Sequence, residues 1–431
     1  MMEANTFNLI RNKLDVMDLY GYEITEESVT GWEFYFIRHK LDQNRAKKIG
    51  SINVTVYRLL DEGKNVGNAN ASFSPTVTEE EIDKTLADLY FEAGLVKDPV
   101  YKLNDKQLAE LPEGQAPDVA VISSDFIKAM NRIPENDAEY LNSYEIFANA
   151  VKRHFLNSNG VEYTVTYPSS TLEVVTNARD ESHEVELYRM YTSGTCDENR
   201  IKDDVTRVLG FGKDRLSSVP TPKLGSYDVI FSTEAAAQIY SYLTYQMSAG
   251  FVVRKYSDME IGKPLSSEFS GDKVSIRIVP QLENSSCSFS ADSEGASITE
   301  RYILKDGVGC GYWGSRKFCQ YLGLDDCSNA YNFVVDGGMD SEETIRSGNY
   351  LEIVEFSDFQ VDPVAGDIAG EIRLGYLHTD EGAKIVCGGS VSGSMKEAVS
   401  DMKFSAETVQ YDTMVIPKVT RLKNLRINGA E

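Results

Sequence analysis

Two carboxylates, Asp292 and Glu294, stand one residue apart in the run Asp292-Ser293-Glu294-Gly295. Paired acids can act as general acid and general base, or they can hold a metal ion. The chain would then be an autonomous hydrolase with a non-histidine site and a weakly held metal. Neighbouring acids on a loop are more often only solvated, and the residues themselves leave both interpretations open.

The histidines and cysteines do not have the spacing of a usual zinc site. No two of the four histidines are close enough to form an HxxxH or HExxH pair on a helix. The six cysteines show no CxxC spacing, and acidic and polar side chains stand where a signal peptide would be apolar. We therefore expect reduced thiols and a cytoplasmic protein.

The element that must position any site is the run 232–255 near the middle of the chain, which has no charged side chain from Ala235 to Val253. Apolar residues recur at helical spacing within 232–255, which predicts one helix with Ser232 as its N-cap and Gly250 near its end. The run also holds two glutamines and three tyrosines, which makes it too polar for a membrane span. Buried in a protein, these groups need hydrogen-bond partners or a water-filled cleft. A core helix and a cleft-lining helix both remain open.

Three glycine-containing segments could line a binding site. The run 309–314 matches GxGxxG, but a turn precedes it and no acidic residue ends a second strand after it. A tight, close-packed turn is therefore a better interpretation than a dinucleotide site. The segment 356–372 predicts a hairpin with a proline and glycine corner. The segment 388–396 is a glycine and serine loop that either lines a pocket with N–H groups or is flexible.

The net charge argues against nucleic acid as a ligand. With 43 basic and 67 acidic side chains, the chain carries a formal charge of −24 and would repel a phosphate backbone. The densest basic run, 45–48, is short and predicts a solvated turn or strand edge. We expect neither nucleic acid nor a membrane as a partner.

Periodicity and turn residues predict an α+β protein of three units. These are an N-terminal helix and antiparallel-sheet unit at 1–100, a central α+β unit at 101–222 and a large strand-rich C-terminal domain at 223–431. Besides 232–255, helices are predicted at 5–20, 78–92, 134–156, 201–209, 315–322 and 341–346. Strands are predicted at 32–38, 51–58, 67–73, 163–167, 172–176, 185–192, 227–231, 274–278, 302–304, 350–356, 371–377 and 383–387.

Taken together, these segments resemble the TldD/PmbA family, proteins once called modulators of DNA gyrase and now regarded as subunits of a metalloprotease. The resemblance extends over roughly the whole chain and is most specific in its C-terminal half. It is carried by Arg254-Lys255, the run 292–295, Gly307-Val308, the corner 361–370 and Ser392-Gly393. Within the corner, Ile368 and Ala369 stand where the family commonly has an aromatic residue and a serine.

The family contains two kinds of subunit. One carries HExxxH on the helix after the buried strand, and a cysteine from the late Ser-Gly loop completes its zinc site. The other, PmbA or TldE, lacks these ligands and pairs with the first. Aligned on Arg254-Lys255, the HExxxH positions fall on 241–246, from Ser241 to Gln246, and aligned on Ser392-Gly393 the cysteine falls on Ser394. The resemblance therefore implies a PmbA/TldE-like chain with no zinc of its own.

By this resemblance we expect a non-zinc subunit of a cytoplasmic TldD/TldE-type metalloprotease that acts on unfolded or modified peptides. Its partner would be a TldD-like, HExxxH-bearing subunit that holds the zinc, or a second copy of this chain. No catalytic residue and no metal ligand is expected here. The alternatives are the autonomous hydrolase and a non-catalytic peptide-binding protein. The candidate residues of the substrate cleft are Ser241, Tyr242, Gln246, Asp292, Glu294 and Ser394.

Overall fold

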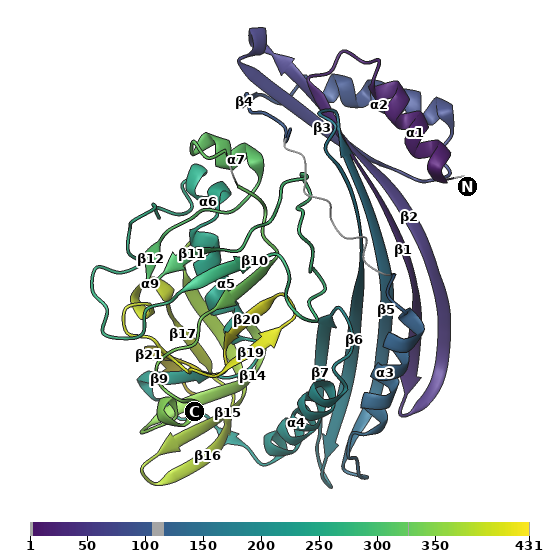
Figure 1. The fold of residues 1–431 in the computed structure, drawn as a ribbon. Helices are drawn as coiled ribbons and strands as arrows, with labels where there is room; N and C mark the ends of the chain where they lie inside the picture. Colours follow the sequence, from purple (N-terminus) through teal and green to yellow (C-terminus); the bar gives the residue numbers. More distant parts are fainter. Residues whose placement is uncertain (1–2, 106–115, 326, 431) are drawn as a thin grey trace.

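The computed structural model describes residues 3–105, 116–325 and 327–430, and within them the chain forms two bodies (Figure 1). The first is a long, curved, antiparallel sheet with the strand order β4-β3-β2-β1-β5-β6-β7. The second is a C-terminal body built on two further sheets. Together with their helices, the two bodies confirm the predicted α+β class. The strands of the first sheet are β1 (Gly21–Ile37), β2 (Lys40–Leu60), β3 (Asn65–Phe73), β4 (Asp98–Pro99), β5 (Glu139–Asn157), β6 (Glu162–Arg179) and β7 (Glu184–Ser193).

Strand β5 lies at the centre of this sheet, where the sequence predicts a helix at 134–156. That prediction is wrong. Tyr144, Ile146 and Ala148 are buried at every second position, and β5 pairs with β1 on one side and with β6 on the other. This pairing outweighs the local helical pattern, because neighbours that are distant in sequence bury the side chains of a central strand. The strands predicted at 163–167 and 172–176 are likewise parts of the single strand β6.

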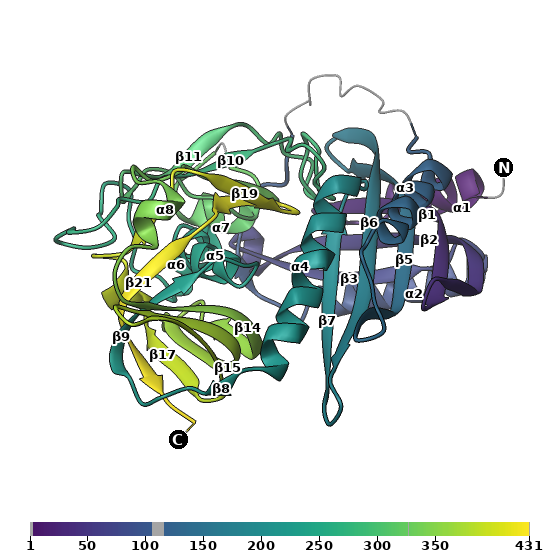
Figure 2. The ribbon, with the colours of Figure 1, turned by 90° about the horizontal axis from the view of Figure 1, so that it is seen from below.

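Four helices pack on the sheet. α1 (Glu3–Leu14) and α2 (Glu79–Glu92) lie near β1, β2 and β3. Both helices were predicted, but α1 ends at Leu14 and not at the predicted residue 20. α3 (Val119–Asn131) was not predicted from the sequence, although the Asp118 side chain caps it by accepting hydrogen bonds from two N–H groups of its first turn. α4 (Glu198–Leu216) lies between the sheet and the C-terminal body (Figure 2).

The C-terminal body contains two sheets with a helix between them. One sheet has the order β14-β9-β21-β17-β15-β16-β8, and the other has the order β12-β11-β10-β13-β20-β19. The strands are β8 (Val219–Pro220), β9 (Gly225–Phe231), β10 (Ile276–Val279), β11 (Arg301–Lys305), β12 (Val308–Gly309), β13 (Asn332–Val335), β14 (Tyr350–Val361), β15 (Asp367–Thr379), β16 (Gly382–Cys387), β17 (Ser390–Ser394), β18 (Lys403–Phe404), β19 (Thr408–Tyr411), β20 (Met414–Pro417) and β21 (Thr420–Asn428). The helices are α5 (Ala236–Gln246), α6 (Ala249–Val253), α7 (Arg316–Tyr321), α8 (Glu342–Ile345) and α9 (Met395–Ala398).

The run predicted as one helix at 232–255 is two helices, α5 and α6. The chain breaks between them because Ser248 forms a bridge with Trp313, and the Ala249 N–H donates to the Trp313 carbonyl at 2.8 Å. Ser232 is not the N-cap, since its hydroxyl contacts the Glu352 carboxylate instead. Gly250 lies inside α6 rather than at a helix end.

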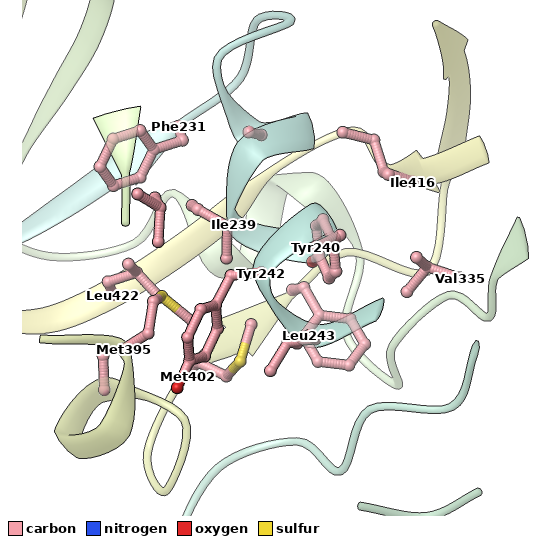
Figure 3. Packing of buried hydrophobic residues seen from close by; sticks show 14 of the residues in the cluster. Phe231, Ile239, Tyr240, Tyr242, Leu243, Val335, Met395, Met402, Ile416 and Leu422 are labelled. Atoms are coloured by element: carbon pink, nitrogen blue, oxygen red, sulfur yellow. The ribbon is translucent and has the colours of Figure 1, made fainter. Parts of the chain in front are cut away.

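Helix α5 is the centre of the C-terminal core. It contacts β14 of one sheet and β20 of the other. Figure 3 shows Ile239, Tyr240 and Leu243 among side chains that come from both sheets. Ile239, Tyr240 and Leu243 are fully buried. The apolar stripe predicted for this helix is therefore confirmed as a core-forming face.

The predicted unit boundaries can be placed on this topology. The boundary near residue 100 separates β1–β4 from β5–β7, which share one sheet, and the boundary near 222 falls between β8 and β9. The three-unit division stays a prediction. No helix in the described part of the chain is long and apolar enough to cross a membrane.

The cysteines differ from the expectation of reduced thiols in one pair. Cys319 of α7 and Cys327 are joined by a disulfide, with their Cα atoms 6.1 Å apart. Nothing in their spacing predicts this pair, because α7 and the chain that follows it fold back on each other. The other four cysteines are free.

Candidate functional site

The turn between β14 and β15, residues 362–366, gathers three of the six candidate residues. The Gln246 side-chain amide donates a hydrogen bond to the Pro363 carbonyl at 3.1 Å. The Tyr242 ring lies against Gly366, where an added Cβ would stand only 3.0 Å from the Tyr242 hydroxyl oxygen. Gly366 also has a φ of +79°, so both the backbone and the space at this position favour glycine.

Strand β17 brings Ser394 to the same turn. Ser394 stands opposite Asp367 in the ladder between β17 and β15, and the next residue, Met395, donates its N–H to the Gly366 carbonyl at 2.7 Å. Figure 3 shows Tyr242 close to Met395 and Met402. The segment 388–396, predicted as a loop, is thus mostly a paired strand followed by α9. The predicted hairpin at 356–372 is confirmed.

Of the candidate side chains around the turn, those of Tyr242 and Gln246 are buried, and those of Ser241 and Ser394 are half-buried. Tyr242 is 5% exposed and Gln246 is 6% exposed. Burial raises the pKa of Tyr242 to about 12, so its hydroxyl stays protonated near neutral pH. Ser241 is half-buried, and its carbonyl accepts a hydrogen bond from the Thr244 hydroxyl at 2.8 Å.

The donor set around the turn does not fit zinc. The positions that the resemblance aligns with zinc ligands carry two serines and a glutamine, Ser241, Ser394 and Gln246, and these are poor zinc ligands. The glutamine amide is already bonded to a carbonyl. Within the described residues, no group of three or more His, Cys, Asp or Glu side chains is placed to hold a metal ion.

Of the other two candidates, Asp292 is buried and Glu294 is half-buried. Asp292 is fully buried, and its carboxylate accepts hydrogen bonds from the N–H groups of Glu294 at 2.9 Å, Ala296 at 2.8 Å and Asn329 at 2.8 Å. Glu294 accepts one from the Arg316 N–H at 2.7 Å. The interpretation of this pair as solvated loop acids is therefore wrong, because the loop folds back onto its own carboxylate.

The environment of Glu294 favours the neutral form of its carboxyl group. Burial raises the pKa of Glu294 to about 8, and the nearby Asp292 charge raises it further. Burial also raises the pKa of Asp292. Glu23 of β1 belongs to the same electrostatic group, because burial raises its pKa to about 7 and the Asp292 charge acts on it. Its carboxylate accepts a hydrogen bond from the Tyr57 hydroxyl at 2.8 Å.

The structure thus divides the six candidates between two places. Tyr242, Gln246 and Ser394 meet at the 362–366 turn, with Ser241 on the same helix. Asp292 and Glu294 lie where the loops of the C-terminal body meet β1. Sequence reasoning missed Glu23, and no local pattern marks it, because its burial depends on the C-terminal body covering the first sheet.

A third place was also missed, a cavity of about 240 Å³ beside α4. Arg189 of β7 lies in its wall, where it forms an ion pair with Glu234 at 3.0 Å and a second one with the buried Glu355. Asp204 and Tyr411 also line it. Its walls therefore come from the first sheet, α4 and the C-terminal body together, and no short motif could reveal it.

The close backbone packing predicted for 309–314 is confirmed, although the segment is the end of β12 and an irregular stretch rather than a turn. An added Cβ at Gly309 would stand 2.7 Å from the Glu260 carbonyl oxygen, and one at Gly311 would stand 2.9 Å from the Tyr302 carbonyl oxygen. The glycines of this segment thus allow close backbone packing rather than an approach to a dinucleotide.

Comparisons with known proteins agree with this architecture. Residues 224–429 match the PmbA/TldA metallopeptidase C-terminal domain. The chain is 22% identical over 404 residues to Metalloprotease PmbA of Escherichia coli O157:H7, which covers 88% of this chain and 85% of that protein. Among solved structures, TldE from Thermococcus kodakarensis is similar with a TM-score of 0.77 and 17% identity, covering 98% of this chain and 100% of that one. A DNA gyrase modulator structure from Bacteroides thetaiotaomicron has a TM-score of 0.75 and 14% identity, and covers 100% of both chains. At these identities the solved structures show a shared fold.

Proposed function

Because the chain belongs to the TldD/PmbA family, we propose that it is the PmbA/TldE-type, non-zinc subunit of a two-subunit metalloprotease. A TldD-like partner with an HExxxH motif would supply the zinc, the activated water and the general base. This chain would shape the chamber that admits unfolded or modified peptides. Without the partner it would pair with a second copy of itself. We place this complex in the cytoplasm.

The observation that carries the proposal is the pair of hydrogen bonds that the turn at 362–366 accepts from neighbouring elements. Gln246 of α5 donates to the Pro363 carbonyl, and Met395, the residue after β17, donates its N–H to the Gly366 carbonyl. Both elements are therefore hydrogen-bonded to the same turn. Neither these contacts nor the serines nearby provide a base for water or a ligand for zinc. In this role Tyr242, Gln246 and Ser394 support the chamber wall and take no part in the chemistry.

An autonomous hydrolase is the second candidate, and one observation favours it. The pKa of Glu294, raised to about 8, suits a general acid at neutral pH. Against it stands Asp292, whose carboxylate is occupied by three backbone N–H groups. A carboxylate held in this way orders its loop and is poorly placed to bind a metal as well.

Cleavage assays with the purified chain, alone and mixed with a TldD-like subunit, separate the candidates. With fluorescently labelled, heat-denatured casein as the substrate, we expect no cleavage by this chain alone and chelator-sensitive cleavage by the mixture. The Glu294→Gln variant should retain the mixture's activity. Cleavage by the chain alone, lost in Glu294→Gln, would instead establish the autonomous hydrolase. Saturable casein binding without turnover, with or without the partner, would indicate a pure binding protein.

The cytoplasmic location has its own test. The Cys319–Cys327 disulfide is the observation that argues against it, because such bonds are rare in reducing compartments. Both cysteines are buried, so intact cells are quenched with acid and the thiols are alkylated in the denatured protein. Mass spectrometry should then find both cysteines alkylated if the proposed location is right. A protected pair would contradict it.

A further inference from the structure

A cavity of about 260 Å³ lies where the segment that follows β4 meets the C-terminal body. Its walls include Asn104 from that segment, Arg301 at the start of β11, Arg316 at the start of α7, and Ser328. A single water needs roughly 10–15 Å³ of such space, so the cavity has room for a small ligand. None of the six candidate residues lines it.

Two guanidinium groups in this cavity have no carboxylate partner among the residues that the structure describes. Arg301 donates from Nη1 to the Thr299 carbonyl at 3.2 Å, and its buried Nη2 has no hydrogen-bond partner in the described ranges 3–105, 116–325 and 327–430. Arg316 donates from Nε to the Lys102 carbonyl at 2.8 Å. In the part of the chain that the structure describes, neither guanidinium forms an ion pair. Both arginines are half-buried, and a partly desolvated positive charge that no carboxylate pairs would be stabilised by an anion.

An unpartnered hydroxyl lies in the same cavity. Ser328 is 1% exposed, and its Oγ has no hydrogen-bond partner among the described residues. Buried polar atoms are almost always paired, with protein or with a ligand or water. Two unmet donors, the Arg301 Nη2 group and the Ser328 hydroxyl, therefore line one cavity.

The acids nearby do not fill this role. Asp325 lines the cavity but is exposed and forms no ion pair with either arginine in the described structure. Asp292 acts on Arg301 only through space, since its own oxygens accept backbone N–H groups. The positive charge of the cavity is thus left for a ligand to balance.

We propose that this cavity is a binding site for a small oxyanion, in which the guanidinium groups of Arg301 and Arg316 and the Ser328 hydroxyl donate to its oxygens. The planar fork of a guanidinium matches both carboxylate and phosphate. The ligand is either the C-terminal carboxylate of a peptide or free phosphate. The site goes beyond the proposed subunit role, because it lies within this chain and needs neither partner nor zinc.

Isothermal titration calorimetry on the purified full chain tests the site at constant ionic strength and pH 7. The probes are acetyl-dialanine with a free carboxylate, the same peptide as its amide, and inorganic phosphate. We expect saturable binding of an oxyanion and none of the amide. Tighter binding of acetyl-dialanine identifies a peptide carboxylate as the ligand, and tighter binding of phosphate identifies the free ion. If neither anion binds, or the amide binds as well as the acid, the proposal is overturned and the cavity holds only water.

Three variants locate the binding. Arg301→Gln should weaken the affinity at least about tenfold, the usual effect of losing a charge-assisted hydrogen bond. Arg373→Gln removes the same charge from an exposed position outside the cavity and should leave the affinity unchanged. Ser328→Ala keeps the fold even if Arg301→Gln does not, because its hydroxyl has no protein partner to lose. It should weaken binding about threefold to tenfold. Equal affinities for Ser328→Ala and the natural chain would count against the site.

Discussion

The side-chain amide of Gln246 donates a 3.1 Å hydrogen bond to the main-chain carbonyl of Pro363. This contact joins the last residue of α5 to the turn between β14 and β15. The resemblance aligns this position with the second histidine of HExxxH, and here it holds a structural contact instead. If this chain is a non-zinc subunit, as we propose, Gln246 stabilises the turn at the position where the zinc-binding subunit has a metal ligand.

Replacing Gln246 by leucine should lower the free energy of unfolding by about 1 kcal/mol, because the Pro363 carbonyl loses its donor. Urea denaturation measures the change. Gln360→Leu is the matched control, since Gln360 lies exposed on β14 and should change stability by less than about 0.5 kcal/mol. In the mixture with a TldD-like subunit, cleavage should also fall for Gln246→Leu. Unchanged cleavage would show that α5 is only a core helix.

Replacing Gly366 by alanine should destabilise the chain by about 2 kcal/mol, from a positive φ and from contact with Tyr242. Gly348→Ala is the control for the backbone alone, because Gly348 has a φ of +72° and no atom within 4 Å of an added Cβ. It should cost only about 1 kcal/mol. Thermal and urea unfolding compare the two. Equal losses of stability in the two variants would mean that a Cβ at position 366 does not clash with Tyr242.

Glu294 should make stability depend on pH. Its pKa is raised to about 8 in the folded chain and is about 4.3 in an unfolded one. Between these values the folded chain keeps a proton that the unfolded chain has lost, so stability is full below about pH 4.3 and falls as the pH rises toward about 8. The Glu294→Gln variant does not titrate there, and it should match the natural chain at pH 5 and exceed it by about 1–3 kcal/mol at pH 9.

The measurement for Glu294 is urea unfolding across this pH range. Glu283→Gln is the control, because Glu283 is exposed on a loop of the same body. Parallel stability curves for the natural chain and Glu294→Gln would contradict the buried, protonated state of this carboxyl.

Several elements of both bodies could be predicted from local sequence. The hairpin of β14 and β15 follows from its proline and glycine corner, and the apolar stripe of α5 from its periodicity. Helix α2 follows from its Thr78 and Glu81 capping pair. These signals are local, and each one describes residues that contact each other within one or two elements.

The rest depended on contacts between distant segments. β5 has the local pattern of a helix but becomes a strand, because β1 and β6 flank it. The burial of Asp292 depends on residue Asn329, and that of Glu23 on the C-terminal body as a whole. Motifs alone aligned Ser241, Gln246 and Ser394 with the zinc-ligand positions of the family. They did not predict that Gln246 and Ser394 meet at the 362–366 turn.

Arg189 should contribute more to the free energy of unfolding than an ordinary surface cation does. It is paired with Glu234 and with Glu355, which is 3% exposed, and burial raises the pKa of Glu355 to about 7 although Arg189 lowers it. Arg189→Gln leaves a buried, unpaired carboxyl and should cost about 3 kcal/mol above pH 8, less at pH 6 where that carboxyl is protonated.

A double-mutant cycle with Glu355→Gln measures the pair. The double variant should recover most of the loss, because no unpaired charge remains. Arg373→Gln, in an exposed ion pair with Glu371, should change stability by less than about 1 kcal/mol. If Arg189→Gln costs no more than Arg373→Gln, β7 and the C-terminal body are not held together by this pair.

The most direct test of the non-zinc account is the metal content of the purified, untagged chain. The protein is exposed to zinc, dialysed, and measured by elemental mass spectrometry beside a TldD-like subunit treated in the same way. We predict that this chain retains no zinc while the HExxxH-bearing subunit does. A stoichiometric, tightly held zinc in this chain would contradict it, and would make an autonomous metalloenzyme the better description.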